Sequence, residues 1–201
     1  MKIKFTVVLA CLLIGTFFLT SCQEKPEIGQ VINYLKIGAS SYQACGTIIM
    51  TTLQDTDPAK YAKFCEANEH IKTFWNLGID GLQAYLENKN VGTDAVVINL
   101  TSAKVAMRQL FELINLDPAL RTYIEASISA VQAITTIILP QVEIVEGQQV
   151  DLSDCKITLT CPTGPITVKS IAPYKEDLKV LLSGEPELTP EMENLKKSLG
   201  E

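Results

Sequence analysis

Four stretches of the chain show the spacing of apolar residues that is typical of amphipathic helices. From Ile28 to Gln54, apolar residues recur at steps of three and four, which places them on one helical face. The same spacing predicts three further helices, over about 58–87, 93–115 and 117–139. Because short turns join these segments, they predict an antiparallel four-helix bundle.

Two Asp-Pro pairs mark the starts of the second and fourth predicted helices. Asp57 precedes Pro58, and Asp117 precedes Pro118. An aspartate oxygen accepts a hydrogen bond from a backbone N–H of the first turn, and proline is tolerated at the first helical position. Both helices are therefore expected to begin at these pairs.

The fourth predicted helix carries little charge after Glu125, which indicates a central, well-buried position. A membrane-spanning segment is the weaker interpretation, because Arg121, Glu125 and Gln132 would all be costly in lipid. The apolar positions of all four segments are therefore interpreted as the core of a water-facing bundle.

The pattern changes after Pro140. Glycine and proline separate short apolar stretches that predict strands at 142–145, 156–160 and 166–169. Short helices are expected from Pro173 to Leu182 and from Thr189-Pro190 onward. The predicted fold is thus mainly α: a four-helix bundle over 28–140, with a C-terminal extension over 141–201 that packs on it and contains an irregular or short β segment and one or two short helices.

The N-terminus has the three parts of a secretory signal. Lys2 and Lys4 precede an uncharged, largely apolar run from Phe5 to Leu19, and Leu19-Thr20-Ser21-Cys22 follows. The apolar run has about 15 residues, whereas a helix needs about 20 to cross the hydrocarbon core. A permanent transmembrane anchor is therefore the weaker interpretation.

The sequence Leu19-Thr20-Ser21-Cys22 resembles the lipobox of bacterial lipoproteins, a resemblance that covers only residues 1–22. It implies a signal peptide over 1–21 and a lipidated tether over 22–27. The thiol of Cys22 would receive a diacylglyceryl group and the new amino group an acyl chain such as palmitate. Two or three chains hold a protein firmly on a membrane. The alternative is an ordinary secretory signal in which Cys22 has no role.

The family also suggests a location. In enterobacteria-like systems, an Asp after the lipidated cysteine retains the protein in the inner membrane, and this chain has Gln23 there. The expected location is the cell envelope, on the outer membrane facing the periplasm rather than on the inner membrane.

The charge of the chain excludes several partners. Removal of Lys2 and Lys4 with the signal lowers the basic residues from 17 to 15, against 23 acidic residues, so the mature chain has a net charge of −8. Nucleic acid is not expected as a partner of such an acidic chain. Anionic lipid would repel it too, so the membrane partner must be held through the lipid on Cys22.

Four cysteines remain in the mature chain besides Cys22. In an exported protein, Cys45, Cys65, Cys155 and Cys161 suggest two disulfides, for which three pairings exist. Cys45 lies about 13 Å before the end of the first predicted helix and Cys65 about 10 Å after the start of the second, at 1.5 Å per residue. The expected pairs are Cys45–Cys65 and, by elimination, Cys155–Cys161. The alternatives are buried thiols, or one late cysteine that ties the tail to the bundle.

Little catalytic chemistry is visible. His70 is the single histidine, and the helical wheel of the second segment places it opposite the apolar face, toward solvent. No nucleophile elbow, phosphate loop or run of zinc ligands is present. The sequence thus predicts no catalytic residue, no metal ligand and no cofactor, and an enzyme is the least favoured function.

The favoured function is a non-enzymatic interaction or accessory protein that binds an envelope protein. The alternative is a carrier or sensor of an apolar ligand, with Met107, Phe111 and Ile134 lining a cavity between the third and fourth helices. A large closed cavity would favour the carrier, and an exposed apolar groove would favour the docking protein.

Overall fold

The computed structural model describes residues 28–87, 92–141, 150–162 and 171–200. This part of the chain contains six α-helices and no β-strand. The helices are α2 (Ile28–Thr56), α3 (Pro58–Glu87), α4 (Asp94–Ile114), α5 (Pro118–Ala133), α6 (Ala172–Gly184) and α7 (Pro190–Ser198). The prediction of a mainly helical fold is confirmed, including the two short helices near the C-terminus.

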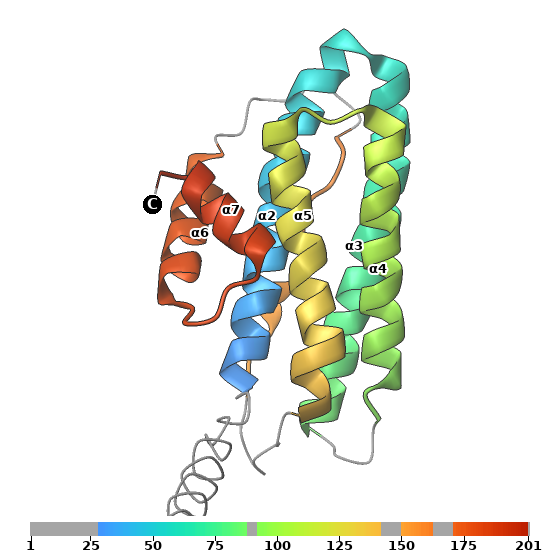
Figure 1. Cartoon of the computed structure of the whole chain (residues 1–201). Helices are drawn as coiled ribbons and strands as arrows, with labels where there is room; N and C mark the ends of the chain where they lie inside the picture. The colour runs from blue at the N-terminus through green and yellow to red at the C-terminus, as the bar shows by residue number, and fades with distance from the viewer. Residues whose placement is uncertain (1–27, 88–91, 142–149, 163–170, 201) are drawn as a thin grey trace, which may run out of the picture.

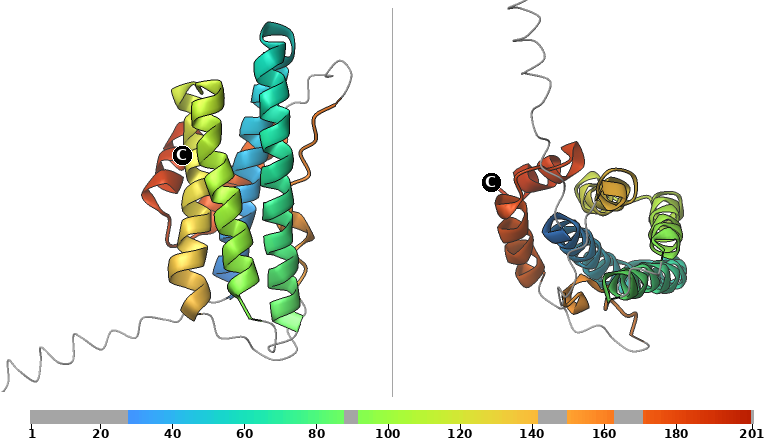
Figure 2. Two further views of the ribbon diagram at one scale, coloured as in Figure 1. Left: turned by 90° about the vertical axis from the view of Figure 1, so that its right-hand side faces the viewer. Right: turned by 90° about the horizontal axis from the view of Figure 1, so that it is seen from below.

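The four long helices lie side by side, and successive helices run in opposite directions (Figure 1). Viewed along their axes, α2, α3, α4 and α5 form a ring, with α6 and α7 outside it (Figure 2). The most extensive helix contacts join α3 to α4 and α2 to α5, while α6 packs on α2 and α7 on α5. This packing is consistent with a bundle.

The Asp-Pro pairs start helices as expected. Asp57 Oδ1 accepts a hydrogen bond from the backbone N–H of Lys60 at 3.0 Å, and Asp117 Oδ1 accepts one from Ala119 at 2.7 Å. These bonds satisfy backbone donors that the first turn of a helix leaves without a partner.

The end of α5 differs from the expectation. The sequence predicted one α-helix to about residue 139, but α5 ends at Ala133 and continues as a π-helix over Ile134–Ile138 and a 3₁₀ turn over Leu139–Gln141. Short π-helical segments are rare and occur frequently at functional sites. No helix within the described ranges is long and apolar enough to cross a membrane.

The strand predicted over 156–160 is wrong. The segment has the alternation of a strand, with Ile157 and Leu159 buried and Thr158 and Thr160 exposed. No neighbouring strand pairs with it in the described structure, because helical side chains bind its backbone instead. The other two predicted strands, at 142–145 and 166–169, lie outside the described residues.

Trp75 on α3 is the largest fully buried side chain of the described residues. It packs against Gly38 of α2, where a Cβ would lie 2.6 Å from the indole Cη2 atom. A glycine is therefore needed at residue 38 for α2 to approach the indole so closely.

Candidate functional site

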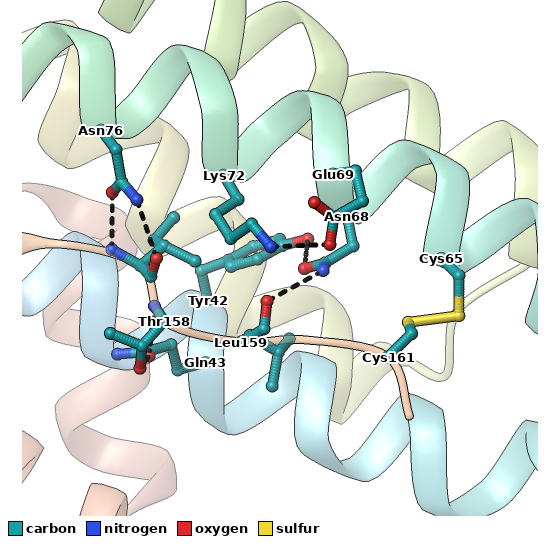
Figure 3. A network of polar contacts seen from close by, with 11 residues as sticks. Tyr42, Gln43, Cys65, Asn68, Glu69, Lys72, Asn76, Thr158, Leu159 and Cys161 are labelled. Atoms are coloured by element: carbon teal, nitrogen blue, oxygen red, sulfur yellow. Dashed lines mark hydrogen bonds and ion pairs between the residues drawn. A yellow bond between two sulfur atoms is a disulfide. The ribbon is translucent and has the colours of Figure 1, made fainter. Parts of the chain in front are cut away.

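Residues 155–162 lie along α2 and α3; Cys155 ends a 3₁₀ turn, Ser153–Cys155, and the chain is extended from Lys156 onward (Figure 3). We call this segment the strap. Asn76 on α3 binds it with both amide atoms, since Oδ1 accepts from the N–H of Ile157 at 2.9 Å and Nδ2 donates to its carbonyl at 3.0 Å. On the α2 side, Gln43 Oε1 accepts from the backbone N–H of Thr158 at 3.0 Å and from its hydroxyl at 2.7 Å. The two amides thus replace the neighbours that a strand would have in a sheet.

A buried polar chain joins the strap to the core. The Tyr42 hydroxyl donates to Asn68 Oδ1 at 3.0 Å, and Asn68 Nδ2 donates to the carbonyl of Leu159 at 3.1 Å. The indole N–H of Trp75 donates to the carbonyl of Cys155 at 2.7 Å. Tyr42, Asn68 and Trp75 are fully buried, so each of these bonds satisfies a polar atom that water cannot reach. Burial also raises the pKa of Tyr42 well above its ordinary value.

A disulfide closes the far end of the strap. It joins Cys65 on α3 to Cys161, with 5.7 Å between the Cα atoms and a sequence separation of 96. The predicted pairs Cys45–Cys65 and Cys155–Cys161 are therefore wrong, and the alternative of a late cysteine tied to the bundle is correct.

The positions of the other two cysteines explain the error. Cys45 and Cys155 are buried thiols. The Cys45 thiol donates to the carbonyl of Leu120 in α5, so it faces α5 and not Cys65 on α3, and the Cys155 thiol donates to the carbonyl of Ile32 in α2. Burial raises the pKa of Cys155 to about 12 and raises the pKa of Cys45 far above its ordinary value. Both thiols are therefore protonated at neutral pH, and neither has the character of a reactive cysteine.

Gly46 lets the strap approach α2. A Cβ on this residue would overlap Leu159 Cδ2. Leu159 is buried against this point of the helix. The strap is thus seated by a close apolar contact as well as by hydrogen bonds.

An open cleft of about 550 Å³ lies along α5, between α4 and α7. We call it the α5 cleft. The side of the cleft that α5 and its continuation form is lined by Glu125, Ile128, Ser129, Gln132, Ala133, Thr136 and Ile137. The last two belong to the π-helical segment, and the Ile137 side chain is 58% exposed. Arg108 and Phe111 of α4 form one wall, and Thr189, Glu191 and Asn194, at and within the start of α7, form the other.

The two walls of the α5 cleft differ in charge. Arg108 makes no ion pair with any described residue, and Lys104 lies one turn before it. Burial lowers the pKa of Lys104 below its ordinary value, and the charge of Arg108 lowers it further. Arg121 instead lies over the Phe111 ring at 4.7 Å and pairs with Glu125 at 3.0 Å. The α4 wall thus carries the cation Arg108, the α5 side carries Glu125 in its pair with Arg121, and the α7 wall carries Glu191.

A second open hollow, of about 540 Å³, lies between α3 and α4. We call it the α3–α4 groove. Its lining contains no Asp, Glu, Lys or Arg and consists of Ala67, His70, Phe74, Thr101, Ser102, Val105, Ala106 and Gln109. Leu77 follows Phe74 by one turn and Ile98 precedes Val105 by two, so both extend this face; their exposed fractions are 48% and 63%.

The structure separates the residues that were predicted to line a carrier's cavity. Met107 and Ile134 are fully buried in the core, whereas Phe111 lines the α5 cleft. His70 faces solvent, as the helical wheel predicted, and borders the α3–α4 groove. Cys22 lies outside the described residues. Within the described part, no group of three or more His, Cys, Asp or Glu is placed to hold a metal ion.

Sequence reasoning missed the residues that hold the strap. Tyr61, Cys65, Asn68, Trp75 and Asn76 follow one another at helical spacing on the side of α3 that contacts the strap, where Tyr61 donates to the carbonyl of Pro162 at 3.2 Å. The available clue was Asn68, a polar residue that lies close to the apolar face of the helix. A buried amide needs partners, and so it indicates a segment that crosses the helix there.

Comparison with known proteins gives no match: no family model, no curated protein and no solved structure is significantly similar to this chain. Function must therefore be inferred from the residues and geometry of the chain itself.

Proposed function

We propose that this protein is a lipid-anchored envelope lipoprotein whose helical domain acts as a non-enzymatic docking protein. The anchor is the lipid on Cys22, and the location is the outer membrane, facing the periplasm. An antiparallel four-helix bundle is the scaffold, and the α5 cleft is the surface that binds an envelope protein.

The Cys65–Cys161 disulfide supports an extracytoplasmic location, because disulfides persist in oxidising compartments. Residues 23–27 join the lipidated cysteine to the start of α2 at Ile28. Five residues span at most about 17 Å. The bundle therefore lies close to the membrane that holds it.

The single observation that carries the docking function is the open α5 cleft. It runs along one helix, between a cationic and an acidic wall, and its exposed apolar Ile137 has no cover among the described residues. An amphipathic helix fits such a groove when its apolar side meets the floor. Charge complementarity requires acidic residues on the flank that faces Arg108, and basic residues on the flank that faces Glu191. The expected partner is an envelope protein with such a helix.

The anchor is tested by metabolic labelling with palmitate. Cys22→Ser should remove the label and block normal signal cleavage, because the thiol accepts the lipid. Cys11→Ser is the matched control, since Cys11 lies within the signal and should leave labelling intact. A Cys22→Ser chain that matures and fractionates with the membrane like the wild type would refute the lipoprotein assignment.

The docking site is tested with a photo-crosslinking residue at Gln132, an exposed position on the cleft floor. One adduct is expected in intact cells, attached to a helix of the partner. Arg108→Glu should abolish it, and charge reversal on the partner helix should restore it. The same crosslinker at Val180, which is exposed on α6, is the control. An adduct that persists in Arg108→Glu, or that also forms from Val180, would contradict docking through this cleft.

A further inference from the structure

We propose that Glu185 is a proton-controlled latch between helix α2 and the turn that joins α6 to α7, and that this latch holds the α7 wall of the α5 cleft in place. The latch itself follows from the burial and the contacts of the Glu185 carboxyl group. Its effect on docking rests on the function proposed above, because docking gives the position of the α7 wall a consequence.

The turn between α6 and α7, residues 185–189, is held on the first part of α2. Glu185 Oε2 accepts a hydrogen bond from Asn33 Nδ2 at 3.3 Å, and the Tyr34 hydroxyl donates to the carbonyl of Glu187. The preceding helix, α6, packs along α2 as well, whereas α7 packs on α5 (Figure 1). These contacts make the turn the point where the α6–α7 pair is fastened to the start of α2.

The carboxyl group of Glu185 is buried without a cation. Glu185 is 6% exposed and is the one Asp, Glu, Lys or Arg among the buried residues of the described ranges. Its hydrogen-bond donors are neutral, namely Asn33 and the backbone N–H of Glu187. Lys196 of α7 donates to the carbonyl of Leu182 at 3.3 Å instead. A buried charge without a counter-ion is costly, so the ionised carboxylate favours a position that water can reach.

The titratable groups that face Glu185 do not offset its charge. Tyr34 of α2 is neutral, because burial first, and then the charges of Glu185 and Glu187, raise its pKa to about 12. Glu187 is exposed and acidic. Burial raises the pKa of Glu185 above its ordinary value, although hydrogen bonds from Asn33 and from the Glu187 N–H oppose the rise. The latched state thus binds the proton more tightly than an opened state, so the latch is firm at acidic pH and weakens as pH rises through the raised pKa.

The same turn ends at the α5 cleft. The Thr189 hydroxyl accepts a hydrogen bond from the backbone N–H of Met192 at 3.3 Å, which caps the start of α7. It also shares a hydrogen bond of 2.8 Å with the hydroxyl of Ser129 on α5. Thr189 and Glu191 both line the cleft. A turn that leaves α2 therefore displaces the α7 wall, and a latched turn keeps that wall in place.

Hydrogen exchange of the full lipidated protein in detergent tests the latch. Glu185→Gln replaces the carboxyl group with a neutral group of the same shape, so it should stay latched at every pH. The ratio of wild-type to variant exchange in α7 should be smallest at about pH 4 and severalfold higher at about pH 8. Glu193→Gln, which removes an exposed carboxylate from α7, is the matched control. A ratio that does not change with pH, or an equal rise relative to Glu193→Gln and Glu185→Gln, would overturn the proposal.

Two variants of Asn33 test the latch without changing Glu185. Asn33→Lys places a cation beside the carboxylate, so α7 should exchange more slowly than in the wild type at about pH 8. Asn33→Asp places a second carboxylate there, so α7 should exchange faster. Circular dichroism confirms that each variant is folded. Changes in the same direction for both variants would overturn the proposal.

The crosslinker at Gln132 separates the latch from the docking function. In intact cells, the wild-type adduct should be stronger at about pH 5 than at about pH 8, whereas Glu185→Gln should give equal adduct at both. If the exchange ratio rises with pH but no adduct forms at either pH, docking is refuted and the latch stands. Equal adduct together with a flat exchange ratio would refute the latch and leave docking standing. Equal adduct together with a rising ratio would overturn the link between the latch and the cleft.

Discussion

The two sides of helix α3 differ in how their polar and apolar groups are covered. On one side, Asn68, Trp75 and Asn76 bind the backbone of the strap, and Cys65 is covalently joined to it. On the other side, Phe74 and His70 border an open groove. The strap thus covers one face of α3, whereas no described segment covers the face that borders the groove.

Mutations on the two sides of α3 should therefore affect different properties of the protein. The strap side has buried hydrogen bonds, which are lost on unfolding, and a disulfide, which restrains the unfolded chain, so changes there should lower the free energy of unfolding. The open side buries less of each side chain, so changes there should alter the surface of the groove and leave the fold nearly unchanged. Neighbouring residues on α3 allow this contrast to be tested directly.

The largest expected effect comes from the adjacent aromatic residues Trp75 and Phe74. Trp75→Ala should lower the free energy of unfolding by about 3–5 kcal/mol, because it opens a cavity in the core and leaves the Cys155 carbonyl without its donor. Phe74→Ala should cost less than half as much, because its side chain is only partly buried. Urea unfolding measures both. Equal losses would mean that the two faces do not differ.

The disulfide should have the next largest effect. Cys161→Ala should lower stability by about 2–4 kcal/mol, since the bond joins residues 96 positions apart and restrains the unfolded chain. Reductant should weaken the wild type by a similar amount and leave Cys161→Ala unchanged. Cys45→Ala, which removes a buried thiol, should stay sensitive to reductant. A Cys161→Ala variant that is still weakened by reductant would show a different pairing.

Asn68 and His70 provide a matched pair two residues apart. Asn68→Ala leaves the Tyr42 hydroxyl and the Leu159 carbonyl without partners in the core, at a cost of about 1–3 kcal/mol. His70→Ala changes an exposed side chain and should alter stability by about 0.5 kcal/mol or less. Thermal unfolding followed by circular dichroism compares them. A larger loss for His70→Ala would contradict the assignment of the two faces.

The smallest effect is on thiol reactivity, with no change in stability. Burial raises the pKa of Cys155 to about 12 and raises that of Cys45 further, so the reactive thiolate is scarce in the folded state. Labelling at neutral pH should therefore be slow, rise with pH, and become fast on unfolding. Without reductant, the unfolded mature chain should label only at these two thiols. Labelling of Cys65 or Cys161 under these conditions would contradict the disulfide.

The helices could be predicted from the sequence because their start signals and apolar spacing are local. Asp57 and Asp117 cap α3 and α5 as expected. The neighbours of each helix could not be predicted in the same way. An apolar face indicates that a side of a helix is buried, but not which segment covers it. Cys45 and Cys65 lie at similar distances from the turn that joins their two helices. Cys45 nevertheless contacts Leu120, and Cys65 is bonded to Cys161.

The strap shows the same limit for the C-terminal segment. The alternation of Ile157 and Leu159 with exposed threonines predicted a strand, and the backbone is indeed extended. A strand needs a partner strand, and this segment is bound by Asn76 and Gln43 instead. The α5 cleft and the α3–α4 groove could not be predicted from the sequence either, because their shapes depend on how α4 packs against α3 and α5. The sequence did indicate that His70 faces solvent, since that depends on one helix alone.

Oxidative footprinting of the purified protein tests most directly whether the strap covers one face of α3 and the other face stays exposed. The same protein is compared in its folded state and after unfolding in urea. Oxidation of Trp75, which binds the strap, should rise strongly on unfolding, whereas oxidation of the exposed groove residues Leu77, Ile98 and Val105 should rise much less. An equal rise at Trp75 and at the groove residues, or a larger rise at the groove, would contradict this division of α3 into a covered face and an open one.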